Sequence, residues 1–178
     1  DMALQGKSNI PIFSILTIHK PIETFNYVVK VSKKYKIRPK IFMVGEDIPD
    51  ILKNNSMDVT LLSNEDYRIN HETGKSETGI DLFYNDPKLC CQLLKVVPTR
   101  YAFENMNLRA WFSGLRSSEG HTRTFSEERE TRNDKETKIN PILNWFENEV
   151  WKYMKNNDIP IHPWYQKTFV GGRRIRSL

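Results

Sequence analysis

Three short apolar runs that alternate with helical stretches constrain the fold of this chain more than any other feature. The runs NIPIFSIL, RPKIFMV and MDVTLLS occupy residues 9–16, 38–44 and 57–63. Each is rich in branched or aromatic side chains, which is typical of a buried strand. Between the first two lies IETFNYVVKVSKKYK, whose apolar residues recur at helical spacing after Pro21. This order predicts an α/β fold with a mostly parallel sheet flanked by helices.

The segments that follow continue the alternation. A short helix or turn is expected within 46–55, before the third apolar run. A longer helix is expected over 86–107, with Pro98 interrupting its periodicity because proline cannot donate a backbone hydrogen bond. The segment LRAWFSGL, 108–115, indicates a strand that ends in a glycine turn.

Residues 116–138 differ from these segments because they are charged, of mixed sign and without apolar periodicity. This pattern predicts a mobile surface loop. The segment 144–158 is expected to form an amphipathic helix capped by Asn144. Its apolar face would be made by Trp145, Val150, Trp151 and Met154. The prolines of IPIHPWY, 159–165, predict an extended segment after that helix.

In parallel sheets, ligands bind beyond the carboxyl ends of the strands, and this rule selects two stretches. LTIHK, 16–20, follows the first strand, where Thr17 suits a phosphate or ribose contact and His19 is either a ligand contact or structural. SGLRSSEGHTR, 113–123, follows a later strand. There Gly114 permits a tight turn, and Arg116 and Arg123 offer the forked donors that suit phosphate or sulfate. The alternative for the second stretch is a surface loop with two solvated arginines.

The two cysteines of the chain, Cys90 and Cys91, are adjacent within the predicted helix. One interpretation is a pair of buried structural thiols. A vicinal disulfide is disfavoured by its geometry. The third interpretation is a metal or cluster site, for which a [4Fe–4S] cluster would need four cysteines and this chain offers two. Lys95, four residues after Cys91, is expected to lower the pKa of a nearby thiol, unless it is simply solvated.

The charge balance indicates an anionic ligand. The 178 residues carry a net charge of +5 with a pI near 9.1, which fits a nucleic acid or a small polyanion such as a nucleotide. No apolar run reaches the roughly 18 residues of a membrane helix, and no signal peptide is recognisable. Two adjacent cysteines make no disulfide framework, so we expect a reducing cytoplasm and no membrane partner.

Three motifs resemble the phosphoadenylyl-sulfate and adenylyl-sulfate reductase family. The first is a Cys-Cys-x-x-x-Lys-Val-x-Pro run, matched by Cys90, Cys91, Lys95, Val96 and Pro98. The second is a Trp-φ-x-Gly-Leu-Arg loop with a later arginine, matched by Trp111, Gly114, Leu115, Arg116 and Arg123. The third is an Asn-Pro helix that ends in Ile-Pro-x-x-Pro, matched by Asn140, Pro141, Trp145, Val150, Trp151, Ile159, Pro160 and Pro163. All three occur in the family's order within residues 88–165.

The amino-terminal third resembles the family's strand, Asp-Thr-Gly turn and helix, matched by Thr17, Glu23 and Thr24. It departs from the pattern where Leu16 stands for the aspartate and Ile18 for the glycine. The family's phosphate loop is expected just upstream of residue 1, and its second cysteine pair just downstream of residue 178. The resemblance therefore implies one incomplete reductase-like domain over 1–178, lacking its phosphate-loop strand and carboxyl-terminal tail.

The resemblance implies an adenine-nucleotide α-hydrolase-like fold and a substrate that is adenylyl sulfate or its 3′-phosphorylated form. The sulfonyl group would pass to a cysteine thiolate on a carboxyl-terminal tail, and a thioredoxin-like or glutaredoxin-like reductant would release sulfite in sulfate assimilation. Cys90 and Cys91 would be two of four ligands of a [4Fe–4S] cluster, with Lys95 near cluster and substrate. Arg116 and Arg123 would contact the anion, and Arg173, Arg174 and Arg176 of the last segment would be further sulfate or phosphate contacts.

Two other functions stay open at this stage. One is a reaction of the same fold, such as ATP-dependent adenylyl transfer or sulfur insertion into nucleic acid, for which the missing aspartate leaves room. The other is a non-catalytic nucleotide-binding module. On the reductase interpretation the basic charge serves a polyanion pocket, so a nucleic-acid partner is not expected, and a homo-oligomer is left open.

Overall fold

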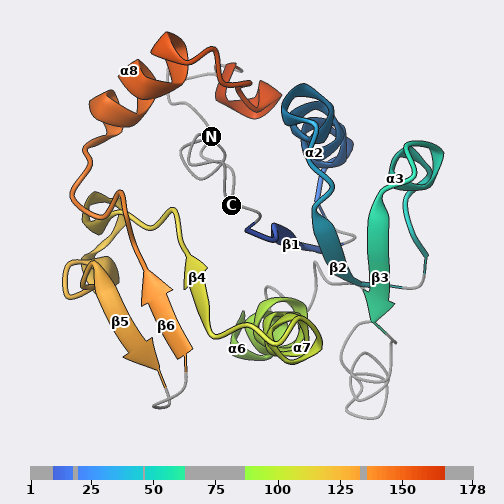
Figure 1. Ribbon diagram of the computed structural model, residues 1–178, viewed down its shortest axis with the longest axis horizontal. Helices are drawn as coiled ribbons and strands as arrows, with labels where there is room; N and C mark the ends of the chain where they lie inside the picture. Colours follow the sequence, from blue (N-terminus) through green and yellow to red (C-terminus); the bar gives the residue numbers. More distant parts are fainter. Residues whose placement is uncertain (1–9, 18–19, 46, 63–86, 133–135, 167–178) are drawn as a thin grey trace. The chain divides into compact units, whose positions relative to one another are not determined.

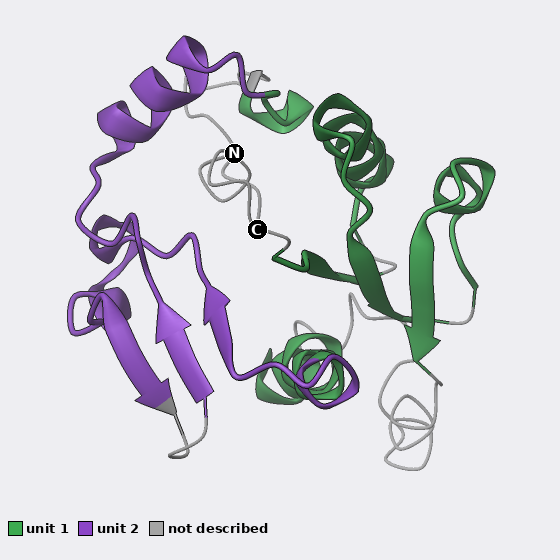
Figure 2. Cartoon of the chain, viewed as in Figure 1, with its two compact units in different colours: residues 1–102, 160–178 green, residues 103–159 purple. Residues whose placement is uncertain are grey.

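The computed structural model describes residues 10–17, 20–45, 47–62, 87–132 and 136–166. The chain divides into two compact units, one made by residues 1–102 with 160–178 and the other by residues 103–159 (Figure 2). We call them unit 1 and unit 2 and describe each by itself. The single domain predicted from the sequence stays a prediction.

Unit 1 contains a parallel sheet of three strands in the order β1-β2-β3 (Figure 1). The strands are β1 (Phe13–Thr17), β2 (Lys40–Val44) and β3 (Asp58–Leu62). Helix α2 (Ile22–Tyr35) connects the first two, and the short helix α3 (Asp50–Asn54) connects the last two. Each of the three apolar runs and both intervening helices are thus confirmed, and so is the α/β fold class with its parallel sheet.

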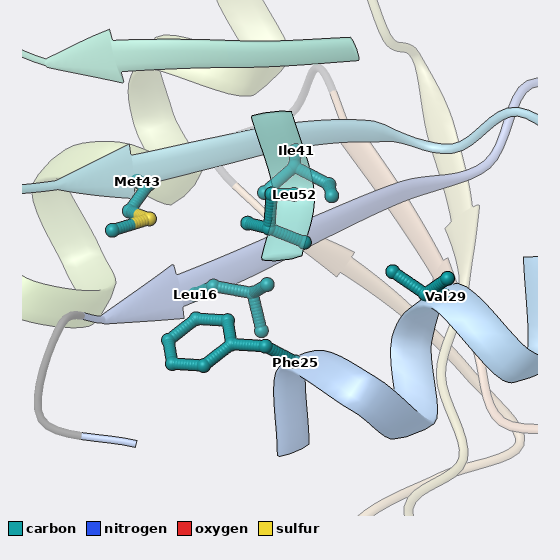
Figure 3. Close-up of a cluster of buried hydrophobic side chains, with 6 residues drawn as sticks. All are labelled: Leu16, Phe25, Val29, Ile41, Met43 and Leu52. Atoms are coloured by element: carbon teal, nitrogen blue, oxygen red, sulfur yellow. The ribbon is translucent and has the colours of Figure 1, made fainter. Parts of the chain in front are cut away.

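One face of this sheet packs on α2 and α3. Its buried residues are shown in Figure 3 and comprise Leu16, Phe25, Val29, Ile41, Met43 and Leu52. Ile41 and Met43 belong to this face because alternate residues of a strand point to the same side. They are fully buried, as is Leu52 of α3. The apolar spacing of α2 exists because this face of the helix covers the sheet.

The opposite face of the sheet carries the other residues of β2. The ring of Phe42 meets Tyr101 edge to face at 5.9 Å between centroids, and Val44 packs with Leu94. Both partners come from the helical segment 87–105, so β2 is covered on both faces. This explains why β2 is continuously apolar rather than alternating.

The segment 87–105 is helical throughout, as the sequence predicts, but it changes its winding. It consists of α6 (Pro87–Cys91), a π-helical turn η1 (Gln92–Val96) and α7 (Val97–Asn105). The wide turn lies directly before Pro98, which has no N–H to donate and whose ring crowds the preceding turn. The interruption expected at Pro98 therefore takes the form of a π-helical turn, and the helix continues beyond it.

Unit 2 contains a small mixed sheet in the order β4-β6-β5. Its strands are β4 (Ala110–Phe112), β5 (Arg129–Arg132) and β6 (Glu136–Ile139), with β4 parallel and β5 antiparallel to β6. The prediction that 116–138 is a loop was wrong for these strands. Their apolar alternation is missing because a polar contact holds the pair: Lys138, largely buried on β6, directs its Nζ to Glu130 Oε1 at 3.4 Å.

The amphipathic helix of unit 2 is α8 (Glu147–Asn156), which begins later than predicted. Phe146 is its N-cap residue, and its N–H donates to Glu149 Oε2 at 2.7 Å. Asn144 does not cap the helix, because its amide donates to Glu128 Oε1 at 2.9 Å instead. Trp145 lies before the helix and packs edge to face on Tyr153, 5.4 Å between centroids.

The segment after α8 returns to unit 1. It contains no helix or strand until a 3₁₀ turn, η4 (Pro163–Gln166), so the predicted extended conformation is wrong for its second half. The hydroxyl of Tyr27 on α2 donates to the carbonyl of Pro160 at 2.9 Å. This contact fastens the returning segment to the helix that covers the parallel sheet.

Candidate functional site

The carboxyl edge of the parallel sheet is the first part of the candidate site. The strand register aligns the last residues of the three strands, Thr17 with Val44 and Val44 with Leu62. Thr17 is 9% exposed, and its carbonyl accepts from the N–H of Lys20 at 3.1 Å. The structure thus places the predicted substrate residue Thr17 at the edge where parallel sheets bind ligands.

The cysteine pair lies at the same edge. Cys90 is partly buried and packs, with Leu62, against Val44 and Leu94. Cys91 is exposed, and neither cysteine forms a disulfide. Successive helical residues point about 100° apart, so one thiol faces the strand ends while the other faces outward. Thr17 and Cys90 therefore belong to one edge of one unit.

Lys95 lies near the cysteines, but its charge does not decide the pKa of Cys90. Lys95 lies on the π-helical turn η1, and its positive charge acts on the thiol of Cys90. Burial raises the pKa of Cys90, and the positive charge of Lys95 opposes this rise without overcoming it. The charge of Lys95 therefore acts on Cys90 in the expected direction, but desolvation of the thiolate outweighs it and the pKa of Cys90 is raised overall.

Lys20 is a second cation at this edge, and the sequence reasoning passed over it. Burial and the charge of Lys95 both lower the pKa of Lys20 below its ordinary value. Both lysines add positive charge at this edge, which favours an anionic ligand there. The signal that could have identified Lys20 is its position, because it is the last residue of the LTIHK stretch that follows the first strand.

His162 also approaches this end of α2 and was missed by the sequence reasoning. Its Nε2 lies 3.2 Å from Thr24 Oγ1, and its Nδ1 accepts from the N–H of Trp164 at 3.2 Å. Nδ1 is thus the acceptor, which makes Nε2 the protonated nitrogen that donates to the threonine. Burial lowers the pKa of His162, with Glu23 opposing and Lys20 adding to the shift. Its role here is structural.

The arginine loop lies in unit 2. Two 3₁₀ turns, η2 (Ser117–Glu119) and η3 (His121–Arg123), fold it back on itself. The N–H and the hydroxyl of Ser117 both donate to the carbonyl of Leu143, at 2.8 and 3.0 Å. A Cβ at Gly114 would meet open space, so nothing that packs against this position requires glycine. Ser118 Oγ also donates to the carbonyl of Trp145, at 3.5 Å, so the loop is held by its own turns and by the carbonyls of Leu143 and Trp145.

Glu119 joins the two predicted anion-binding arginines. Its Oε1 accepts from Arg116 Nε at 3.2 Å, and its Oε2 pairs with Nη1 of Arg123. Arg116 Nη1 is buried and has no hydrogen-bond partner among the described residues. The arginines are therefore not simply solvated, and one of them keeps an unused donor. Nothing in the sequence singles out Glu119, because it stands within a run of mixed charge.

The predicted site residues fall into three groups. Thr17, Cys90, Cys91 and Lys95 lie in unit 1, whereas Gly114, Arg116 and Arg123 lie in unit 2. The third group lies outside the described residues and comprises His19, Arg173, Arg174 and Arg176. Each of the first two groups is a local cluster of its own unit.

The fit of a metal centre can be tested on the cysteine pair. The part of the chain that the structure describes holds no cluster of three or more His, Cys, Asp or Glu side chains able to bind a metal ion. Two adjacent thiols, one of them exposed, match half of a four-cysteine ligand set. The chain itself therefore fits such a cluster only in part.

Comparison with known proteins decides the family. The sequence model of the phosphoadenosine phosphosulfate reductase domain matches residues 1–173. The chain belongs to this family. The phosphoadenosine 5′-phosphosulfate reductase of Xylella fastidiosa (strain M12) is 40% identical over 78 residues, which is 44% of this chain and 32% of that protein. The adenosine 5′-phosphosulfate reductase of Bacillus cytotoxicus is 33% identical over 93 residues, 52% of this chain and 39% of that protein.

The reductase-family chain thus matches about a third of the length of these curated relatives. Among solved structures, phosphoadenylyl-sulfate reductase from Candida auris in a phosphate complex is similar with a TM-score of 0.46 and 16% identity, over 90% of this chain and 79% of that one. The resemblance seen in the three motifs is confirmed at the level of the family. Among the described residues, no helix combines the length and apolarity needed to span a membrane.

Proposed function

We propose that this reductase-family chain acts in the reductive transfer of a sulfonyl group from adenylyl sulfate, or from its 3′-phosphorylated form, to a thiol. The observation that carries the proposal is the sheet edge of unit 1, where Thr17, Lys20 and Lys95 lie beside a cysteine pair. Relatives named for both nucleotides support the substrate class. The proposed compartment is the cytoplasm.

The chemistry accounts for the cations. A cysteine thiolate attacks the sulfur, the bond from sulfur to the bridging oxygen breaks, and the nucleotide leaves as the free phosphate with its negative charge. A dithiol of the thioredoxin or glutaredoxin class then reduces the sulfocysteine, releasing sulfite and becoming a disulfide. Lysine and arginine side chains stabilise the charge that moves onto the departing phosphate. No general base is needed if the nucleophile is already a thiolate.

A [4Fe–4S] cluster is part of the proposal. Cys90 and Cys91 would supply two of its four thiolate ligands, and the other two would come from elsewhere in the assembled enzyme. A bound cluster would add a charged, redox-capable group at the edge that holds Lys95. Of the two ligands, Cys90 would hold the cluster at this edge, because its side chain packs against Val44 and Leu94.

The departure at Leu16 is explained without a change of function. Leu16 is 5% exposed and packs in the core with Phe25, so its side chain does not face a ligand. The glycine position, Ile18, lies outside the described residues. The alternatives of ATP-dependent adenylyl transfer and of a non-catalytic nucleotide-binding module are separated from the reductase by the assay below.

The test measures sulfite released by the full-length protein, purified without oxygen, from each nucleotide in the presence of thioredoxin and its reductant. We expect sulfite from at least one nucleotide and no dependence on ATP. Lys95→Gln should lower kcat/KM by about tenfold or more, because it removes one preorganised charge. Lys88→Gln, an exposed lysine on the same helical segment, is the matched control. No sulfite from either nucleotide would refute the function, and absence of iron and labile sulfide would refute the cluster.

A further inference from the structure

We propose that Glu119 is an internal counter-anion, which holds Arg116 and Arg123 in position and competes with the anionic group that binds to them. The proposal deepens the proposed function, on which it rests for the identity of the natural anion. It concerns a residue to which neither the motifs nor the matches assign a role. It depends on contacts within eight successive residues of unit 2.

The first support is that the two carboxylate oxygens of Glu119 have different partners. Oε1 accepts from Arg116 and Oε2 pairs with Arg123, so both oxygens are engaged by the two guanidinium groups. The backbone prepares this arrangement: the N–H of Glu119 donates to the carbonyl of Arg116 at 3.3 Å, and that of Arg123 to Gly120 at 3.0 Å. Residues three and four apart are thereby brought face to face by the two turns.

The second support is an N–H donor of Arg116 that the carboxylate of Glu119 does not engage. Arg116 Nε is held by the carboxylate, but Nη1 is buried without a hydrogen-bond partner among the described residues. A buried unpaired donor is costly, and in native proteins it usually indicates water, an ion or a ligand. The side chain of Arg116 is only 16% exposed, against 43% for Arg123. Arg116 therefore has a fixed orientation and unused capacity for an acceptor oxygen.

The third support is the charge balance. Two arginines and one glutamate leave a net charge of about one positive unit for a ligand. An anion that bridges the arginines approaches the carboxylate, which repels it in proportion to the ligand's charge. One unit charge at about 4 Å changes affinity about fivefold even in water, and more when the groups are half-buried. Glu119 therefore keeps the empty loop ordered and prevents the anion from binding too tightly to leave.

The experiment measures binding of inorganic sulfate to the full-length protein by calorimetry at fixed low ionic strength. Glu119→Gln keeps the shape and a hydrogen-bond acceptor but removes the charge, so sulfate affinity should rise about fivefold or more. Glu127→Gln removes the same charge from an exposed position of the same unit and is the matched control. Glu119→Asp keeps the charge and should stay within about twofold of the unmodified protein.

A double variant tests whether the gain arises at this loop. Arg123→Gln combined with Glu119→Gln should abolish the gain; a gain that persists would overturn the proposal, because the sulfate would then bind elsewhere. Unchanged or weaker sulfate binding by Glu119→Gln, or no binding by either protein, also overturns it. Failure of the proposed function would give a different combination of results from failure of this proposal. In that case the protein releases no sulfite from either nucleotide, while Glu119→Gln still binds sulfate more tightly.

Discussion

The two units are stabilised by different kinds of contact. Unit 1 has an apolar core in which Ile41, Met43 and Leu52 are fully buried between a sheet and two helices. Unit 2 buries the apolar side chains of Phe103 and Leu143, and with them a lysine and an asparagine, Lys138 at 6% and Asn140 at 0% exposure. The comparison shows that a small sheet can form around a paired charge, and that such a sheet leaves no apolar pattern in its sequence.

The largest effect is expected in the core of unit 1. Leu52→Ala should lower the free energy of unfolding by about 3 kcal/mol, because it removes buried methyl groups and leaves a cavity under the sheet. The measurement is a urea titration followed by far-ultraviolet circular dichroism. Ile22→Ala on α2 is the control, because Ile22 is 57% exposed and should change stability by less than about 0.5 kcal/mol. Equal effects of the two substitutions would contradict the assigned core.

A somewhat smaller effect is expected at the charged pair of unit 2. Lys138→Ala should cost about 2–3 kcal/mol, since it leaves the half-buried carboxylate of Glu130 without its ammonium partner. Lys138→Met combined with Glu130→Leu should recover most of that loss, because an apolar pair of similar volume needs no desolvation of charge. Tryptophan fluorescence suits the measurement, since Trp111, Trp145 and Trp151 belong to this unit. If the double variant is no more stable than Lys138→Ala, then Lys138 and Glu130 stabilise unit 2 through contacts other than their own ion pair.

The same contrast explains which elements could be predicted. Hydrophobic periodicity identified β1, β2, β3 and α2 because an apolar core determines their residues. It failed for β5 and β6, where Lys138 and Glu130 occupy the paired positions that apolar residues would fill. Asn140 Nδ2 adds hydrogen bonds there to the carbonyl of Glu127 and to Glu130 Oε1. The start of α8 was misplaced for a similar reason. Asn144 suited a cap by type, but its amide is taken by Glu128 from a distant part of the chain.

The candidate site was predictable to the extent that it follows strand ends. Thr17 and Cys90 both lie at the carboxyl edge of the parallel sheet, where such sheets bind ligands. The pKa of Cys90 was not predictable, because it depends on how deeply the thiol packs against Val44 and Leu94. Nor was the role of Glu119, since its pairing with two arginines requires the backbone turns at 117–119 and 121–123. Such contacts depend on three-dimensional folding of residues whose types are common on any surface.

The smallest effect on stability is expected at His162, a polar side chain buried in unit 1. His162 is 7% exposed, its Nδ1 accepts from Trp164, and Tyr27 and Tyr165 flank its ring. Burial, helped by the charge of Lys20 and opposed by that of Glu23, lowers its pKa below the ordinary 6.5.

The sign of the pH dependence follows from this lowered pKa. Between the folded and unfolded values the unfolded chain binds more protons, so stability is full above about pH 7 and falls as the pH drops through 6.5 toward the folded value. Protonation of Nδ1 would also end its bond from the N–H of Trp164, loosening the segment that returns to α2. His162→Gln cannot titrate, so the slope of the melting temperature between pH 7 and pH 5.5 should be shallower than in the unmodified protein. His121→Gln, exposed in unit 2, should leave the slope unchanged. Equal slopes for the unmodified protein and His162→Gln would show that the buried imidazole does not contribute to the acid sensitivity of unit 1.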